Sequence, residues 1–221
     1  MTNGLAFDVA HLLAGAMLVV SFMLLYQRRM FGVLNTYALH AFVLALAVAW
    51  QAYIQRAPHL YVTAAIALIF KAIVIPVALH RIVQRLNTHR TVETVIGVGL
   101  TMLAGVGLVA LAILVILPVT AGAEALARED LALSLSIVLL GLLMMITRRN
   151  AITQVVGFFS MENGLILAAA GARGMPLVVE ISVAFSVLIA FVVFGIFIFR
   201  IRERFDTLDI AYLETFRGER R

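Results

Sequence analysis

The sequence predicts an all-α membrane protein: a polytopic bundle of about seven transmembrane helices, with the amino terminus outside and the carboxyl terminus in the cytoplasm. Of the 221 residues, 63% are apolar and 13% are charged, whereas soluble domains are about half apolar and a quarter charged. The mean hydropathy is +1.07. The apolar residues form long runs, and arginines are concentrated in alternate loops between them.

Seven apolar runs come close to the roughly 20 residues that a helix needs to cross a bilayer. Because the first run has no Lys or Arg before it, we expect a retained span and not a signal peptide. Seven spans take up most of the 221 residues, so there is no room for a separate soluble catalytic domain. The predicted spans are 5–26, 32–54, 60–83, 94–117, 131–147, 151–172 and 176–199.

The arginines set the predicted orientation, since cytoplasmic loops carry the excess of positive charge. Thirteen lie in one set of loops and at the carboxyl terminus, and only Arg56, Arg128 and Arg173 lie in the other set. The net charge of +5 therefore reflects topology, and we expect no nucleic-acid partner but a lipid bilayer.

The chain contains no cysteine, which excludes disulfides, thiolate nucleophiles and Cys-ligated clusters. No Gly-rich phosphate loop and no metal-ligand spacing occurs in the sequence. We therefore expect no cofactor, no metal site and no catalytic residue in this chain.

Two oppositely charged residues are predicted near the middle of the membrane. Lys71 lies some 11 residues into the third span and Glu162 some 12 residues into the sixth, each about 15 to 18 Å deep at 1.5 Å per residue. A buried charge should face protein or water and have a partner. Two readings remain open: a static ion pair that locks two helices, or a carboxylate that exchanges a proton.

Other ionisable residues are weaker proton-relay candidates. Glu180 lies about one turn inside the outer end of the seventh span and could simply reach interfacial water. His40 lies about 12 Å from the cytoplasmic side and is either a relay member or a hydrogen-bonded core histidine. Asp8, His11 and His80 are close to span ends, where solvation is expected. A haem ligated by His11 and His40 is disfavoured by their difference in depth.

Small residues recur on two spans, which indicates close helix packing. The fourth span carries Gly97, Thr101 and Gly105, and the sixth carries Gly157, Gly164 and Gly171. Pro76 in the third span removes a backbone hydrogen bond, so we expect the helix to be disrupted beside Lys71.

The carboxyl-terminal third contains a recognisable pattern. It comprises Arg148-Arg149-Asn150, the segment from Gly157 to Gly164 (GFFSMENG), Pro176 to Glu180 (PLVVE) and Arg204 to Asp209 (RFDTLD). The chain resembles component E of hydrogenase 4 and related formate hydrogenlyase-type complexes. Its last three spans are also similar to the K subunit of complex I and the C subunit of multisubunit sodium/proton antiporters. In the K-subunit pattern the membrane carboxylate falls where this chain has Phe159, three residues before Glu162.

The resemblance implies a subunit of the bacterial inner membrane with no active site of its own. Its partners would be antiporter-like membrane subunits and a cytoplasmic hydrogenase-like arm, and it would scaffold them and contribute to a proton path. The alternative is a free-standing proton-coupled secondary transporter. The corresponding regions are 1–130 with four spans, 131–200 with three K-subunit-like spans, and a cytoplasmic tail, 201–221, that has the pattern of an interfacial helix.

Overall fold

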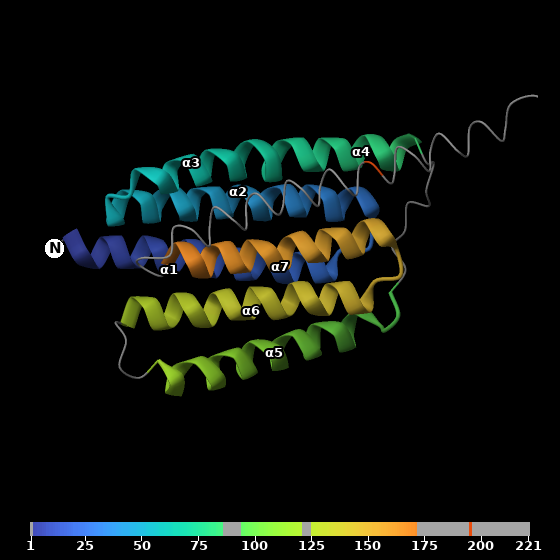
Figure 1. Cartoon of the computed structure of the whole chain (residues 1–221). Coiled ribbons are helices and arrows are strands. Elements are labelled where there is room, and N and C mark those ends of the chain that lie inside the picture. The colour runs from blue at the N-terminus through green and yellow to red at the C-terminus, as the bar shows by residue number, and fades with distance from the viewer. Residues whose placement is uncertain (1, 86–93, 121–124, 172–194, 196–221) are drawn as a thin grey trace, which may run out of the picture.

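The computed structural model describes residues 2–85, 94–120, 125–171 and 195, and all regular secondary structure in this part is helical (Figure 1). The predicted all-α class is confirmed. The seventh predicted span with Glu180, Arg173 and the tail lie outside the described residues. The elements are α1 (Thr2–Tyr26), α2 (Met30–Gln55), α3 (Pro58–Ile66), the π-helical segment η1 (Ala67–Val74), α4 (Ile75–Arg85), α5 (Val98–Val119), α6 (Ala125–Thr147) and α7 (Ala151–Gly171).

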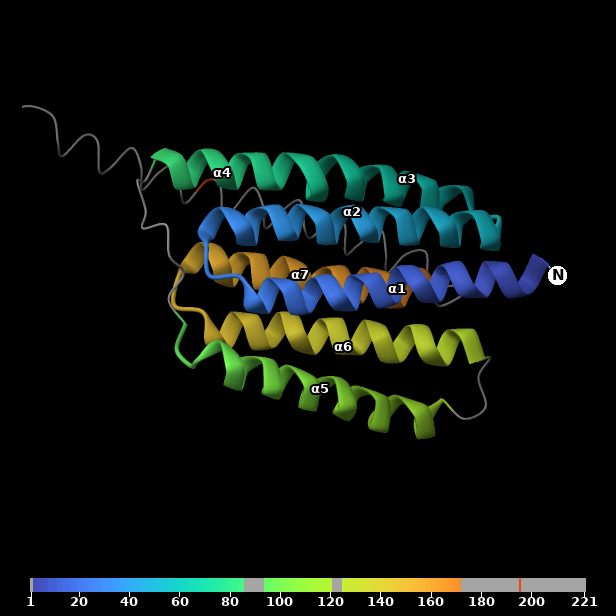
Figure 2. The same ribbon diagram turned by 180° about the vertical axis from the view of Figure 1, so that it is seen from behind.

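Six helices in the described part are long and apolar enough to cross a membrane. They correspond to the first six predicted spans, with α3, η1 and α4 joined into one continuous rod (Figures 1 and 2). The fifth span differs at its start: α6 begins at Ala125, six residues before the predicted 131, so two acidic residues expected in a loop belong to the helix.

Consecutive spans run antiparallel, so the loops alternate between the two ends of the bundle (Figure 1). The carboxyl-terminal ends of α1, α4 and α6 lie together at what we call the arginine-rich end (Figure 1). At this end the segment before α5 is joined to the end of α6, because the Val95 N–H donates to the Thr147 carbonyl at 2.8 Å. The start of α1, the α2–α3 turn and the end of α7 lie at the opposite end. The alternation expected from the arginines is therefore present in the described helices.

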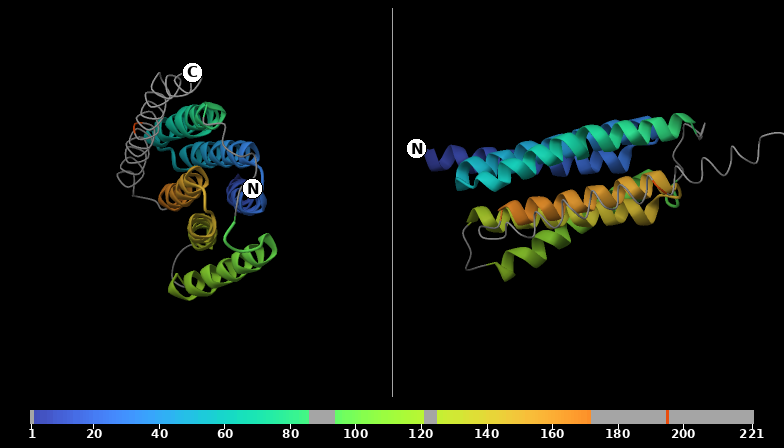
Figure 3. Two further views of the ribbon diagram at one scale, coloured as in Figure 1. Left: turned by 90° about the vertical axis from the view of Figure 1, so that its right-hand side faces the viewer. Right: turned by 45° about the horizontal axis from the view of Figure 1, so that its top comes forward.

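The two helices α6 and α7 pack with their backbones in close approach. A Cβ added to Gly141 would lie 2.5 Å from the Met161 nitrogen, and one added to Gly164 would lie 2.9 Å from the Val138 nitrogen. The predicted packing role of Gly157 and Gly164 is confirmed. On α5 only part of the predicted stripe packs: Gly105 faces Phe22 and Leu140, whereas a Cβ on Gly97 would meet nothing within 4 Å. Helix α5 lies at the edge of the bundle (Figure 3).

The disruption expected beside Lys71 takes the form of π-helical turns. Segment η1 ends at Val74, two residues before Pro76, and the Ile75 N–H donates to the Phe70 carbonyl five residues back. Proline has no N–H to continue an α-helical ladder, and π-helical turns are a known accommodation within longer helices. The rod continues through this point, and Lys71 projects from the irregular segment.

The buried apolar residues form two clusters, one nearer each end of the bundle. The cluster at the arginine-rich end includes Leu24, Leu34 and Ile75, and the cluster at the opposite end includes Met17, Leu44 and Ile166. Buried polar residues on α1, α2, η1 and α7 lie between these two apolar clusters. These residues form the candidate site.

Candidate functional site

Lys71 and Glu162 meet in the middle of the bundle. The Lys71 Nζ lies 3.2 Å from the Glu162 Oε2, and the two side chains are 3% and 5% exposed. The pairing expected from their matching depths is confirmed. Glu162 projects about 140° round the helix from Gly157, at 100° per residue, so α7 uses one face for α6 and another for Lys71.

The pair belongs to a longer chain of buried polar groups from four elements. Lys71 Nζ also donates to Asn163 Oδ1 at 2.8 Å. The Asn163 amide nitrogen lies 3.0 Å from His40 Nδ1, and His40 Nε2 lies 3.0 Å from the Ser21 hydroxyl, which donates to the Met17 carbonyl. His40 and Asn163 are fully buried. The candidates Lys71, Glu162 and His40 are thus brought together, with Asn163 between them.

The donors and acceptors in this chain fix its hydrogen positions. Because the Lys71 ammonium can only donate, Asn163 Oδ1 must accept, and the Asn163 NH₂ group must point at His40 Nδ1. His40 Nδ1 is therefore an acceptor, and Nε2 carries the proton that is donated to Ser21. His40 is a neutral, hydrogen-bonded histidine in this arrangement.

The arrangement separates groups that can exchange protons from groups that hold them in place. Lys71 and Glu162 are both titratable and lie within direct contact, so a proton can pass from the ammonium to the carboxylate and leave two neutral side chains. An amide NH₂ does not titrate, so the link through Asn163 does not carry protons between Lys71 and His40. His40 fixes the orientation of Asn163, and Asn163 fixes Lys71.

Tyr37 also faces this region, although its sequence pattern did not single it out. It lies one turn before His40 on α2, and its ring stacks on Phe159 at a centroid distance of 5.8 Å. Its hydroxyl is buried and has no hydrogen-bond partner among the described residues. The only sequence signal was a tyrosine three residues from a deep histidine.

A second polar cluster lies at the end opposite the arginines. Gln51 Nε2 donates to the buried Asp130 carboxylate at 3.2 Å, and His11 Nδ1 lies 3.2 Å from Glu129 Oε2. Asp130 and Glu129 were missed because the fifth span was expected to begin at 131. His11 and His40 are too far apart to ligate one haem iron. His11 lies ten residues, or about 15 Å, along α1 from Ser21, the residue that contacts His40.

The Arg-Arg-Asn motif has a structural role at the arginine-rich end. Arg148 is buried, and its guanidinium donates to the carbonyls of Leu24 (3.1 Å) and Leu25 (2.7 Å) in the last turn of α1. Burial lowers the pKa of Arg148 from its ordinary value. Asn150 Oδ1 accepts the Ile152 N–H at 2.9 Å, as a capping side chain does at a helix start. Arg149 is exposed.

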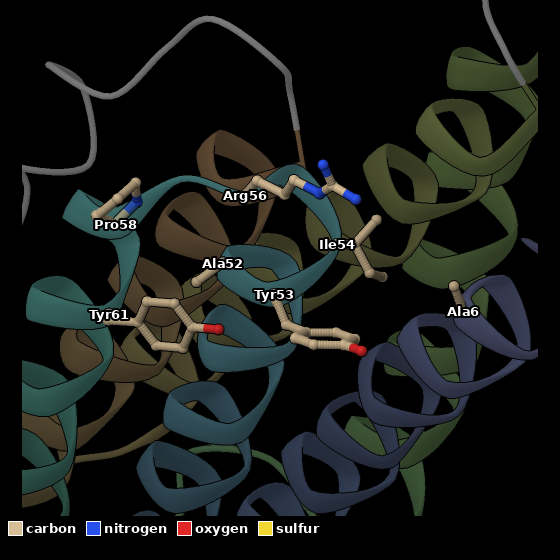
Figure 4. Close-up of a pocket in the computed structure, with 7 residues that line it drawn as sticks. All are labelled: Ala6, Ala52, Tyr53, Ile54, Arg56, Pro58 and Tyr61. Atoms are coloured by element: carbon tan, nitrogen blue, oxygen red, sulfur yellow. The ribbon is translucent and has the colours of Figure 1, made fainter. Parts of the chain in front are cut away.

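A hollow of about 540 Å³ opens near the opposite end, between the start of α1, the end of α2 and the start of α3 (Figure 4). Of the candidate proton-relay residues that the structure describes, Lys71, Glu162 and His40, none lines it. Among the described residues that line it, Arg56 is the one charged side chain. Two tyrosine rings flank the opening, as expected for residues at a membrane interface. The residues that line it are Ala6, Ala52, Tyr53, Ile54, Arg56, Pro58 and Tyr61.

Nearly the whole chain is similar to known bacterial proteins. Hydrogenase-4 component E of Escherichia coli (strain K12) is 27% identical over 208 residues, which cover 93% of this chain and 96% of the relative. The same values hold for hydrogenase-4 component E of Shigella flexneri. The chain is a relative of hydrogenase-4 component E. An uncharacterized protein of Mycobacterium tuberculosis is 25% identical over 206 residues, 92% of this chain and 94% of that protein.

No family model and no solved structure matches the chain. The similarity to component E nevertheless extends well beyond the carboxyl-terminal pattern and includes the helices that carry Ser21, His40 and Lys71. Among the described residues, no group of three or more His, Asp or Glu side chains could hold a metal ion.

Phe159 distinguishes this relative of component E from the K-subunit pattern. The position where that pattern has its carboxylate is filled by a fully buried phenyl ring against Tyr37. The carboxylate of this chain, Glu162, lies nearly one turn further along α7 and faces Lys71. The buried carboxylate of the sixth span is therefore at position 162 in this chain.

Proposed function

We propose that the chain is an integral membrane subunit of an energy-converting, hydrogenase-4-like complex in the bacterial inner membrane. The observation that carries the proposal is its similarity to hydrogenase-4 component E over nearly the full length of both chains. Six membrane-crossing helices with little polypeptide between them fit a scaffold for antiporter-like membrane subunits. A hydrogenase-like arm would attach at the arginine-rich end, which the positive-inside rule assigns to the cytoplasm.

The second part of the proposal is that Lys71 and Glu162 form one step of a proton path through this complex. Support comes from their direct contact at 3.2 Å and from their position between two apolar clusters. A static pair would need no further organisation, but Lys71 is also held by Asn163, which His40 holds in turn. Such fixed geometry keeps the two titratable groups within transfer distance when the charge on either side chain changes.

Co-purification tests membership of the complex. An affinity-tagged full-length chain, extracted from its native membrane in mild detergent, should bring down antiporter-like and hydrogenase-like subunits in fixed proportions. Deleting its gene should reduce assembly of the remaining membrane subunits. A chain that purifies alone and still transports protons when reconstituted into vesicles would contradict the proposal and favour the free-standing transporter.

A further inference from the structure

The polar cluster at the end opposite the arginines has no part in the proposed Lys71–Glu162 step. Its centre is Asp130, which lies in the second turn of α6. This residue is buried, with only 4% of its surface exposed. Asp130 Oδ2 accepts a hydrogen bond from Gln51. Asp130 Oδ1 is buried and has no hydrogen-bond partner in the described part of the chain, although buried polar atoms are normally satisfied.

The neighbouring amides leave only one oxygen of Asp130 able to carry a proton. Gln55 Nε2 donates both to the Ala170 carbonyl at 2.7 Å and to Gln51 Oε1 at 3.1 Å. Since Gln51 Oε1 is an acceptor, the Gln51 NH₂ group must point at Asp130 Oδ2. This oxygen is therefore always an acceptor, and a proton on the carboxyl group sits on Oδ1.

Titratable groups beside Asp130 connect it to the surface. His11 Nδ1 and Glu129 Oε2 lie 3.2 Å apart, and the side chains of Glu129 and His11 are 44% and 45% exposed. Both lie close enough to Asp130 to interact with it electrostatically. The nearest arginine on the same helix, Arg128, is turned away and donates to the Leu117 carbonyl. Within the described residues, the groups that α2 and α7 place beside Asp130 are neutral: the Gln51 amide and Gly171.

Polar groups also lead from Asp130 toward the level of the central pair. Ser134 lies one turn deeper on α6, is fully buried, and its hydroxyl has no hydrogen-bond partner within the described ranges. Its carbonyl is 3.0 Å from the position of a Cβ on Gly164, which places it beside the turn of α7 that carries Glu162 and Asn163. The seam between α6 and α7 therefore has a hydroxyl at the depth of the ion pair.

We propose that Asp130 is a second proton-binding site, which takes up and releases one proton at Oδ1 in exchange with water beside the His11–Glu129 pair. On release, the O–H bond breaks, the proton passes to water or to the Glu129 carboxylate, and Asp130 keeps the negative charge. Uptake is the reverse. Proton binding stands independently of the proposed function, whereas use of Asp130 as the terminus of the path through Lys71 and Glu162 rests on it.

Infrared difference spectroscopy of the full-length chain in its complex, titrated with pH in membrane vesicles, tests the binding site. Asp130→Asn keeps a carbonyl oxygen for Gln51 but removes the titrating group. The C=O band of one protonated carboxyl should disappear in Asp130→Asn and remain in Glu162→Gln. An unchanged set of carboxyl bands in Asp130→Asn would overturn the proposal.

A second variant covers the case in which Asp130→Asn does not accumulate. Gln51→Leu removes the hydrogen bond to Oδ2 without touching the carboxyl, so it should change the pH at which this band disappears, while Arg149→Ala at the other end should not. If the midpoint of the pH titration of this band is unchanged in Gln51→Leu, the proposed binding site at Asp130 is wrong.

Proton pumping by the same vesicles tests the role of Asp130 in the path. Loss of a proton-transfer group typically slows transfer by a factor of about 100 or more, so Asp130→Asn should reduce pumping by at least about tenfold. Normal pumping in Asp130→Asn would overturn that role. Normal pumping in Glu162→Gln, together with loss of the Asp130 band in Asp130→Asn, would instead reject the proposed Lys71–Glu162 step and leave the Asp130 site standing.

Discussion

At the scale of single residues, the sequence predicted the ionisable members of the central site but not its hydrogen-bonding amide and hydroxyl groups. Lys71 and Glu162 stand out because a charge within an apolar span is costly. Asn163, Ser21 and Tyr37 have no such signal, since neutral polar side chains are common in spans and their hydrogen bonds depend on neighbouring helices. Asp130 was missed for another reason, because the start of its helix was placed after it.

The link between Asn163 and His40 should show energetic coupling. Asn163→Leu leaves His40 Nδ1 without its donor, and His40→Leu leaves the Asn163 amide unsatisfied, so each should lower the free energy of unfolding by about 1 to 3 kcal/mol. The double variant should lose less than the sum, because neither orphaned group remains. Unfolding of the purified chain in mixed micelles measures this, and strictly additive losses would contradict the hydrogen bond.

Arg148 should matter for stability and Arg149 should not. Arg148→Ala removes two charge-assisted hydrogen bonds to α1, each contributing about 1.5 to 3 kcal/mol, so the unfolding free energy should fall by about 3 kcal/mol or more. The exposed Arg149 provides a matched control, for which Arg149→Ala should change stability by about 0.5 kcal/mol or less. Equal effects of the two substitutions in the same unfolding assay would show that Arg148 does not cap α1.

At the scale of elements, hydropathy located six spans well but not all their details. The small-residue stripe on α7 was predicted, whereas its counterpart on α6, the single Gly141, has no periodic signal. Pro76 indicated an irregularity beside Lys71, but a proline can produce a kink, a break or π-helical turns, and the sequence alone does not distinguish these forms. Helix starts are equally dependent on context, because a charged residue can belong to a span when a neighbouring helix supplies a hydrogen bond.

The α6–α7 seam should tolerate no side chain at Gly141. Gly141→Ala places a methyl group against the backbone of Met161, and such overpacking typically costs about 1 to 3 kcal/mol. Gly107→Ala on α5 is the control: its Cβ meets nothing within 4 Å, and alanine is the better helix former by up to about 1 kcal/mol. Thermal unfolding of both variants measures the difference, and a harmless Gly141→Ala would contradict the close approach.

At the scale of the whole molecule, the alternation of arginines predicts on which side of the membrane each end of the bundle lies. The chain has no native cysteine, so single cysteines report cleanly. His59→Cys at the opposite end should react with a membrane-impermeant thiol reagent added from the periplasm, and Gly97→Cys at the arginine-rich end should not. Labelling of Gly97→Cys but not of His59→Cys would contradict this orientation and show that the opposite one is correct.

The proton-path proposal rests on Glu162 exchanging a proton with Lys71 and not merely neutralising it. The most direct test is Glu162→Gln in the assembled complex, with subunit abundance, hydrogenase activity and proton pumping measured in the same membrane vesicles. Glutamine keeps the shape and an acceptor for Lys71 but does not titrate, so the subunit should accumulate normally while pumping falls by at least about tenfold. Normal abundance with normal pumping would contradict the relay, and disappearance of the subunit would instead identify the pair as a structural bridge.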